Sequence, residues 1–482
     1  MTAHAIPHIR EFLADGLTPL AAYRRLGADS PYRFLFESVS GGDQVARYSF
    51  LGAQPREIYR VFLDHVEVER DGQKKLLAGS SLGALREILG ATEADTHTIP
   101  FTGGFVGFFG YDFVRMIEVL ESPPPDRFGL PISILARYDN LVVFDHARQR
   151  ILAIANEIEG MVSSGEAESH LDAMSQRLTR AGGGGAVRFP PDASALNGDL
   201  VVVPLTSGED FRSAVEKAKR YIVAGDIFQV VLARRWKIEE SIEPVSLFRA
   251  LRMVNPSPYM VLLESPELAL VGASPEMLVR KVGSRIQIRP IAGTRPRGAD
   301  TQEDRRLATD LLSDPKERAE HIMLVDLGRN DVGRSACAGT VRVPELMEIE
   351  HYSHVMHIVS SVEGEIRPGV TGLDALLACF PAGTVSGAPK IRAMEIIDEL
   401  EPEARGPYAG AVGYLSFSGD LDTCITIRTL MIRENEISVS AGAGIVADSD
   451  PAKEQEETEN KAAGLIAAVD LARRIQLDLD DR

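Results

Sequence analysis

The chain has 482 residues, of which 44% are hydrophobic and 25% charged, so it is long enough for more than one globular domain. Its formal net charge of -18 makes general nucleic-acid binding unexpected. No apolar stretch is long enough to span a membrane, and the opening residues lack the basic-then-apolar order of a secretory signal, so we expect a cytoplasmic protein. The three cysteines (Cys337, Cys379 and Cys424) lie far apart, which argues against a disulfide framework and against a zinc site.

The first part of the chain is predicted to be mostly β. Alternating apolar residues predict antiparallel strands over residues 32–72, and two more strands follow the proline run at residues 123–125. A helix is predicted over residues 166–178. The glycines and prolines that follow it show no periodicity and indicate a flexible connection. We therefore expect an N-terminal part (residues 1–185), a linker (186–206) and a C-terminal part (207–475).

The second part mixes helices and strands without a regular βαβ alternation. Apolar periodicity predicts helices at residues 209–224, 301–312, 316–327, 374–379 and 389–400, a strand at 227–238, and late strands at 411–416, 423–432 and 436–441 before a long C-terminal helix. The turn-forming residues at 327–331 are expected to end their helix abruptly. This mixture favours an α+β fold of mostly antiparallel sheets packed with helices over a doubly wound sheet.

Two pairs of carboxylates are the first candidate site. Glu317 and Glu320 are spaced i,i+3 on a predicted helix, and Glu454 and Glu457 repeat that spacing on the C-terminal helix, where Lys461 follows one turn later. Two such helices facing each other could hold one Mg²⁺, which prefers oxygen ligands. In a chain with 70 acidic residues such pairs also arise by chance, so a solvated acidic helix start remains the alternative.

Several other residues have both a functional and a structural interpretation. Gly442–Gly444 offers backbone amides to an anion, and the small-residue loop at residues 380–390 enters a helix where an anion could bind. Arg428 is predicted in the middle of an apolar strand, where a cation is costly unless an anion meets it. His357 lies in an apolar run and Glu276 follows a proline turn; each is an acid or base if buried, or an ordinary core or surface residue.

The combination of motifs resembles one known family. The stretches SPE (274–276), PIAGTRPRG (290–298), DLGRND (326–331), FPAGTVSGAPK (380–390) and GAGIVADSDPAKEQEET (442–458) occur in the order found in the chorismate-utilising enzymes, and most closely in their anthranilate synthase component I type. The resemblance covers almost the whole chain. It implies the two-layer fold of that family, with an N-terminal regulatory part and a C-terminal chorismate-binding part.

The resemblance also implies an activity. The expected reaction converts chorismate and ammonia to anthranilate and pyruvate, the first step of tryptophan biosynthesis. The metal would be Mg²⁺, held directly by Glu320 and Glu457 with Glu317 and Glu454 nearby. Glu276 is expected to protonate the departing ring hydroxyl, and His357 and Thr384 to lie against the ring, with His357 in proton handling. Chorismate would be bound by Gly293, Thr294, Tyr408, Arg428, Gly442, Ala443, Gly444 and Lys461.

Two positions distinguish members of the family. Aminodeoxychorismate synthases often carry a nucleophilic lysine where this chain has Ala292, and isochorismate and salicylate synthases carry a water-activating lysine where it has Gln229. Both differences point to free ammonia as the nucleophile. Aminodeoxychorismate synthase stays the alternative, because some members lack that lysine. A non-catalytic amino-acid sensor with the same fold is a further alternative. Such a sensor would be expected to have lost the acid and metal-binding residues, which this chain keeps.

Two partners follow from the same resemblance. The chain shows no glutaminase unit of its own, so we expect a glutamine amidotransferase subunit, in a heterotetramer of two plus two. L-Tryptophan is expected as a feedback inhibitor, in a site formed by the N-terminal residues Glu37 and Ser38 and by Pro258, Tyr259 and Met260. Ordinary strand and turn packing is the alternative for these five residues.

Overall fold

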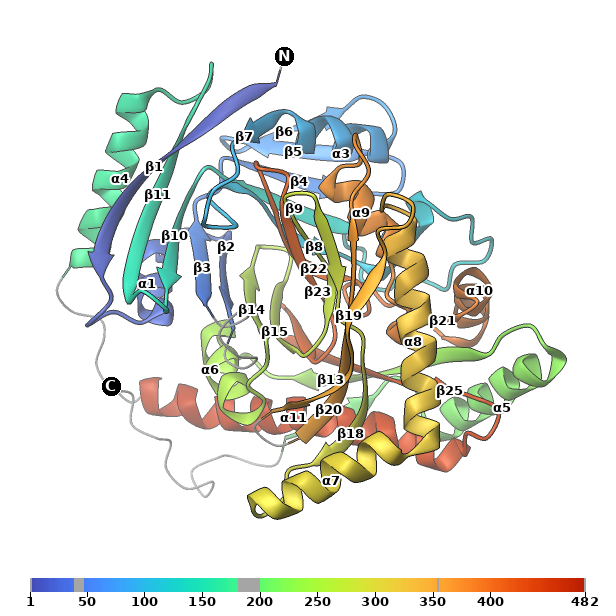
Figure 1. The fold of residues 1–482 in the computed structure, drawn as a ribbon. Helices are drawn as coiled ribbons and strands as arrows, with labels where there is room; N and C mark the ends of the chain where they lie inside the picture. Colours follow the sequence, from blue (N-terminus) through green and yellow to red (C-terminus); the bar gives the residue numbers. More distant parts are fainter. Residues whose placement is uncertain (1, 39–46, 181–199, 353–354, 481–482) are drawn as a thin grey trace.

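Two large, mostly antiparallel sheets form the framework of the protein (Figure 1). The structure is a computed structural model, and it describes residues 2–38, 47–180, 200–352 and 355–480. The predicted α+β class is confirmed. Residues 186–199 of the predicted linker lie outside the described residues, and the division of the chain into two parts stays a prediction.

The first sheet contains strands from both ends of the chain. Its order is β12 (Val202–Pro204), β13 (Gln229–Glu239), β25 (Glu436–Ile445), β24 (Thr429–Arg433), β15 (Ala269–Ser274), β14 (Tyr259–Glu264), β2 (Arg33–Glu37), β3 (Tyr48–Ala53), β10 (Asn140–Asp145), β11 (Arg150–Ile158), β1 (Ala3–Leu13) and β7 (Thr92–Ala94), with β21 (Gly387–Ala388) beside β13. The early strand β2 pairs with β14, placing Glu37 opposite Met260.

The second sheet is shared in the same way. Its order is β18 (Ile291–Pro296), β20 (Val355–Glu365), β17 (Arg285–Ile288), β16 (Met277–Val282), β23 (Leu421–Ile425), β22 (Ala411–Ser416), β8 (Gly104–Phe109), β9 (Ser133–Tyr138), β4 (Glu57–Val61), β5 (Val66–Arg70) and β6 (Gln73–Leu77), with β19 (Arg342–His351) beside β20. Here β8 pairs with β22, so the early and late parts of the chain share one continuous backbone ladder in each sheet.

Helices cover the sheets. They are α1 (Pro19–Gly27), α3 (Ser81–Gly90), α4 (Ser164–Thr179), α5 (Gly208–Ala224), α6 (Pro244–Val254), α7 (Thr301–Ser313), α8 (Pro315–Gly333), α9 (Gly372–Cys379), α10 (Lys390–Leu400) and α11 (Pro451–Asp480), with the 3₁₀ turns η1 (Tyr111–Met116) and η3 (Gly383–Val385). In Figure 1, α11 runs along one end of the molecule beside α6 and α5, against which it packs. No helix in the described part of the chain combines the length and apolarity needed to cross a membrane.

Capping residues set where the two acidic helices begin. Asp314 ends α7 and accepts hydrogen bonds from the first amides of α8, Lys316 N and Glu317 N, at 2.9 and 3.3 Å. Asp450 caps the start of α11 in the same way, accepting hydrogen bonds from the amides of residues 452 and 453 at 3.0 and 3.1 Å. Pro315 and Pro451 occupy the first helical positions, where proline costs no hydrogen bond. Glu317 and Glu454 therefore lie in the first turns of the two helices, and their partners Glu320 and Glu457 lie one turn further along.

Several sequence-based boundaries were wrong. Helix α8 continues through Leu327 and Asp331 to Gly333, because buried contacts on its inner face outweigh the turn preference of these residues. The single strand expected at residues 423–432 is two strands, β23 and β24, which belong to different sheets. Strand β25 extends to Ile445, so the glycines at 442–444 lie within a strand. Strand β1 and helices α1 and α6 were not anticipated.

Candidate active site

Glu276 lies in the short connection between β15 and β16 and is buried. Its backbone is fixed to β23 by a 3.0 Å hydrogen bond from Ile425 N to Glu276 O. Burial raises the pKa of its carboxyl to about 8, although the nearby Thr384 hydroxyl and the charge of Lys461 act in the opposite direction. Because a group with this pKa holds its proton at neutral pH, Glu276 can act as a general acid.

A break in strand pairing orients His357. Gly293 has a φ of +68°, and the register between β18 and β20 shifts between Ala292 and Thr294. His357 Nδ1 lies 2.9 Å from the Gly293 carbonyl oxygen and 3.1 Å from Thr294 Oγ1. A carbonyl only accepts, so Nδ1 carries the hydrogen and Nε2 keeps the free lone pair. Burial lowers the pKa of His357, which favours this neutral form.

Arg428 is a partly buried cation. It lies between β23 and β24 with a φ of +51°, in the left-handed region, and not within a strand as predicted. Within the described residues its guanidinium makes no hydrogen bond or ion pair. Burial lowers its pKa, an effect that the nearby Tyr408 and Glu457 oppose. A desolvated guanidinium held in this way is suited to an anionic ligand.

Small residues in β25 allow close contacts to this region. A side chain at Gly442 would place its Cβ 2.9 Å from the Tyr408 hydroxyl, and one at Gly444 would lie 2.5 Å from Gln229 Nε2. Pairing with β24 covers β25 only from Glu436 to Val439, so the glycine segment borders an open strand edge on that side, while β13 pairs with the other side. The backbone amides of residues 442–444 are therefore partly taken up by hydrogen bonds within the sheet, whereas the sequence predicted that they were available to an anion.

The charges of the four predicted metal ligands act on one another: burial and the charge of Glu457 also raise the pKa of Glu454. Burial raises the pKa of Glu320, and the charges of Glu317 on its own helix and of Glu457 on α11 raise it further. Glu317 accepts a hydrogen bond from Arg295 at 3.1 Å. Lys461 Nζ donates to Glu457 Oε1 at 2.5 Å and to the Gly442 carbonyl at 2.9 Å.

A complete metal cage is not present in this arrangement. No group of three or more His, Cys, Asp or Glu side chains in the described ranges is arranged to hold a metal ion. The mutual repulsion between Glu320 and Glu457 nevertheless marks an excess of negative charge between α8 and α11. Mg²⁺ commonly uses only one or two protein carboxylates and takes its other ligands from water and substrate. Glu320 and Glu457 are therefore candidates for a Mg²⁺ site that water or substrate would have to complete.

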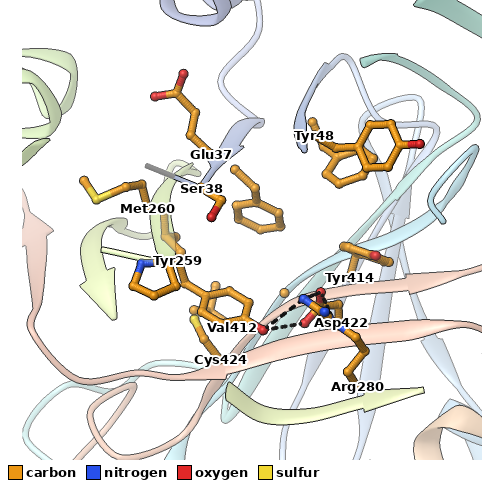
Figure 2. Close-up of a pocket in the computed structure, with 15 residues that line it drawn as sticks. Glu37, Ser38, Tyr48, Tyr259, Met260, Arg280, Val412, Tyr414, Asp422 and Cys424 are labelled. Carbon is orange, nitrogen blue, oxygen red and sulfur yellow. Dashed lines mark hydrogen bonds and ion pairs between the residues drawn. The ribbon is translucent and has the colours of Figure 1, made fainter. Parts of the chain in front are cut away.

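A separate pocket lies between the early and late strands of the two sheets. All five residues of the predicted tryptophan site line it (Figure 2). Glu37 is buried and accepts a hydrogen bond from Arg252 at 3.2 Å, with its carboxylate pointing away from Asp422 in Figure 2. Ser38 Oγ is buried and lacks a hydrogen-bond partner in the described part of the chain.

The floor of this pocket was missed by the sequence analysis. Asp422 accepts hydrogen bonds from Tyr259 at 3.0 Å and from Arg280 Nε at 2.8 Å, as drawn in Figure 2. Arg280 belongs to β16, which begins directly after Glu276. Alternating charged residues on two strands gave no motif, and only the pairing of β16 with β23 brings them together.

Arg405 is a second residue that sequence reasoning missed. It is buried, pairs with Glu401, and donates to the carbonyls of Val385 and Val231 at 2.7 and 2.8 Å. Its guanidinium also lies 5.9 Å from the centre of the Tyr408 ring. Arg405 therefore links the small-residue loop, strand β13 and Tyr408 into one rigid unit.

The sequence and the fold of the chain match a known family. Residues 19–467 match the chorismate binding enzyme family, and the chain belongs to that family. Anthranilate synthase component 1 of Acetivibrio thermocellus is 45% identical to this chain, with 98% of this chain and 96% of the relative covered. The protein of the same description from Thermus thermophilus is 46% identical, with 97% and 98% covered. The crystal structure of anthranilate synthase component I from Streptococcus pneumoniae has a TM-score of 0.77 and 38% identity, covering 94% of this chain and 98% of that one.

Proposed function

We propose that this chain is the chorismate-converting subunit of an anthranilate synthase. It would use ammonia and chorismate to form anthranilate and pyruvate, as the first step of tryptophan biosynthesis. The observation that carries the proposal is Glu276, a buried carboxyl whose pKa of about 8 keeps it protonated at neutral pH, in a full-length relative of these synthases. An acid in that state is what the loss of a ring hydroxyl requires.

The residues divide the work as follows. Arg428 and the Tyr408 hydroxyl bind the enolpyruvyl carboxylate, while Gly293 and Thr294 position the ring. Ammonia adds beside the ring carboxylate, and the proton of Glu276 goes to the leaving hydroxyl, which departs as water. The surplus proton on the new nitrogen returns to the Glu276 carboxylate. His357, neutral with Nε2 free, then takes the ring proton as the ring C–O bond to the enolpyruvyl group breaks, and the released enolpyruvate takes that proton at its methylene carbon to become pyruvate.

Mg²⁺ is part of the proposal. Glu320 and Glu457 would hold it, with Glu317 and Glu454 as neighbours, and it would offset the charge of the ring carboxylate so that a nucleophile can approach. The excess negative charge between α8 and α11 supports this assignment. Lys461, bonded to Glu457, adds a second positive charge at the same end of the site.

Three further features belong to the proposal. A glutamine amidotransferase subunit supplies ammonia, in an assembly of two plus two chains, in line with the component 1 designation of the relatives. L-Tryptophan binds the pocket lined by Glu37, Ser38 and Met260 and inhibits the reaction. The location is the cytoplasm, which agrees with the three free cysteines.

The test is to give the isolated chain chorismate, MgCl₂ and ammonium chloride and to follow anthranilate fluorescence. Formation of the 2-amino product that stops on chelation with EDTA is expected. A 4-amino product would support aminodeoxychorismate synthesis, and isochorismate would refute amination altogether. Tight tryptophan binding without any turnover would identify a sensor.

A further inference from the structure

Tyr352 contacts His357 from the side of β20 opposite to Gly293 and Thr294. Those two residues hold the imidazole by contacts at Nδ1 alone, so they leave it free to tilt about that atom. Strand β19 places Glu350 directly opposite His357, and Tyr352 follows two residues later. The Tyr352 side chain is buried, and its ring centre lies 5.4 Å from that of His357 with the ring planes at 65°. This is the edge-to-face arrangement that aromatic pairs prefer.

Tyr352 is itself anchored at its hydroxyl and at its backbone. The hydroxyl donates to Glu350 Oε2 at 2.9 Å, and Glu350 Oε1 accepts from Arg289 at 2.5 Å. Burial raises the pKa of Tyr352, and the charge of Glu350 raises it further, so the hydroxyl keeps its hydrogen. At the backbone, Arg297 donates to the Tyr352 carbonyl at 2.7 Å, and the Tyr352 amide donates to Val355 O at 2.8 Å. Linked polar groups of this kind fix a side chain in one orientation.

Tyr352 also lies near the candidate general acid. The charge that Glu276 acquires on ionisation acts on the Tyr352 hydroxyl, so Tyr352 is close to both residues to which the proposed function gives a proton-transfer role. The proposed function gives Tyr352 itself no task. A ring that only filled space would need no hydroxyl, because phenylalanine fills the same space without a polar group that has to be paired. The hydroxyl network therefore points to a role in orientation.

We propose that Tyr352 is a positioning residue for His357, and that its anchored ring keeps the imidazole turned so that Nε2 faces the hydrogen that leaves the substrate ring. The proposal rests on the proposed function, in which His357 takes that proton after amination. In this step the ring C–H bond breaks, its proton goes to Nε2, and its electron pair completes the aromatic ring as the C–O bond to the enolpyruvyl group breaks. Tyr352 exchanges no proton, because its hydroxyl hydrogen is donated to Glu350. A tilted imidazole should therefore slow the elimination and leave the earlier amination unchanged.

The ratio of two products tests the positioning role. At a pH of about 8, where His357 is neutral, the unsubstituted chain and Tyr352→Leu are given chorismate, MgCl₂ and ammonium chloride. Mass spectrometry then compares the aminated intermediate, which still carries the enolpyruvyl group, with anthranilate. The ratio of intermediate to anthranilate should rise about 2- to 10-fold in Tyr352→Leu, the factor that corresponds to one aromatic pair. Tyr352→Phe keeps the ring and should keep the ratio. An unchanged ratio in Tyr352→Leu, or an equal rise in Tyr352→Phe, would refute the role of the ring.

A matched pair of variants tests the anchor. Glu350 and Glu345 both accept hydrogen bonds from Arg289 and both side chains are partly exposed, but of the two only Glu350 accepts from Tyr352. Glu350→Ala leaves the buried hydroxyl without its acceptor, so the ring should turn toward another partner and the ratio of intermediate to anthranilate should rise. Glu345→Ala should leave the ratio unchanged, and an equal rise in both variants, or in neither, would overturn the anchoring. If the unsubstituted chain forms neither the intermediate nor anthranilate, the proposed function fails, which is distinct from failure of the positioning role.

Discussion

At the scale of single residues, the site consists of groups held in states that are unfavourable without a ligand. Glu276 is buried as a neutral acid, and Arg428 is desolvated in a left-handed backbone conformation without an anion among the described residues. Such states cost free energy and persist only when the surrounding structure enforces them. Each state has a measurable consequence.

Glu276→Gln should lower kcat about 100-fold or more, the usual range for loss of a general acid. Its stability effect has a definite sign. The folded carboxyl keeps its proton up to pH of about 8, whereas its unfolded value is 4.5, so the wild type loses stability as pH rises between these values. The Glu276→Gln variant should lose less stability over the same pH range, because its amide does not titrate. Urea unfolding at pH 5 and pH 8 measures the difference, and an equal pH dependence in both proteins would contradict the burial argument.

Arg428→Gln should raise the KM for chorismate about 10- to 100-fold, because a hydrogen-bonded charge pair with the substrate is lost. The melting temperature of the free protein should not fall, since a desolvated cation is removed. Arg428→Lys serves as the comparison: it keeps the charge but not the two-pronged geometry, and should recover only part of the affinity. A lower melting temperature with normal KM would assign Arg428 to structure.

At the scale of elements, the irregularity between β18 and β20 is the feature that places His357. Gly293 supplies the carbonyl that receives the Nδ1 hydrogen, and its φ of +68° suits glycine. The register shift at this point turns the strand so that Thr294 and His357 face each other. A regular strand ladder at this point would orient the His357 side chain differently.

Gly293→Ala should therefore reduce kcat as well as stability. The added Cβ would lie 3.0 Å from Leu311 Cδ1 and 3.1 Å from Glu317 Oε2, and the left-handed conformation adds about 1–2 kcal/mol of strain. Gly283→Ala is the control, because Gly283 has a φ of +56° with no atom within 4 Å of the added Cβ. Both variants should lose stability in urea unfolding, but only Gly293→Ala should lose activity. Equal kcat in the two would show that the bulge does not position His357.

At the scale of the whole molecule, both sheets are built jointly from the early and late parts of the chain. The pairing of β2 with β14 places Glu37 opposite Met260, and the pocket between the sheets draws on both parts. A ligand in that pocket would contact strand β16, which begins directly after Glu276 and carries Arg280 on the pocket floor. We therefore expect ligand binding there to shift the candidate catalytic residues.

L-Tryptophan at 100 times its Kd should stabilise the protein by about 2.7 kcal/mol through binding to the folded state alone. It should also raise the apparent KM for chorismate. Ser38→Leu fills the pocket and should weaken both effects at least about tenfold in tryptophan concentration, given that Ser38 faces the other lining residues. Differential scanning fluorimetry and anthranilate fluorescence measure the two effects. Unaltered inhibition in Ser38→Leu would place the inhibitor elsewhere.

The sequence by itself determined the α+β class, helices such as α4 and α5, and the family, because apolar periodicity and long motifs are local properties of the chain. It also named Glu276 and His357 as candidate acid and base, though not their protonation states.

Only the tertiary structure decided the rest. Helix α8 extends past its turn residues because its inner face is buried, and Arg428 lies between two sheets where one strand was expected. The Arg280–Asp422 and Lys390–Asp331 pairs join residues 142 and 59 positions apart. Such contacts, and the burial that sets the pKa of Glu276, depend on what the rest of the chain packs against each residue, and no local pattern carries that information.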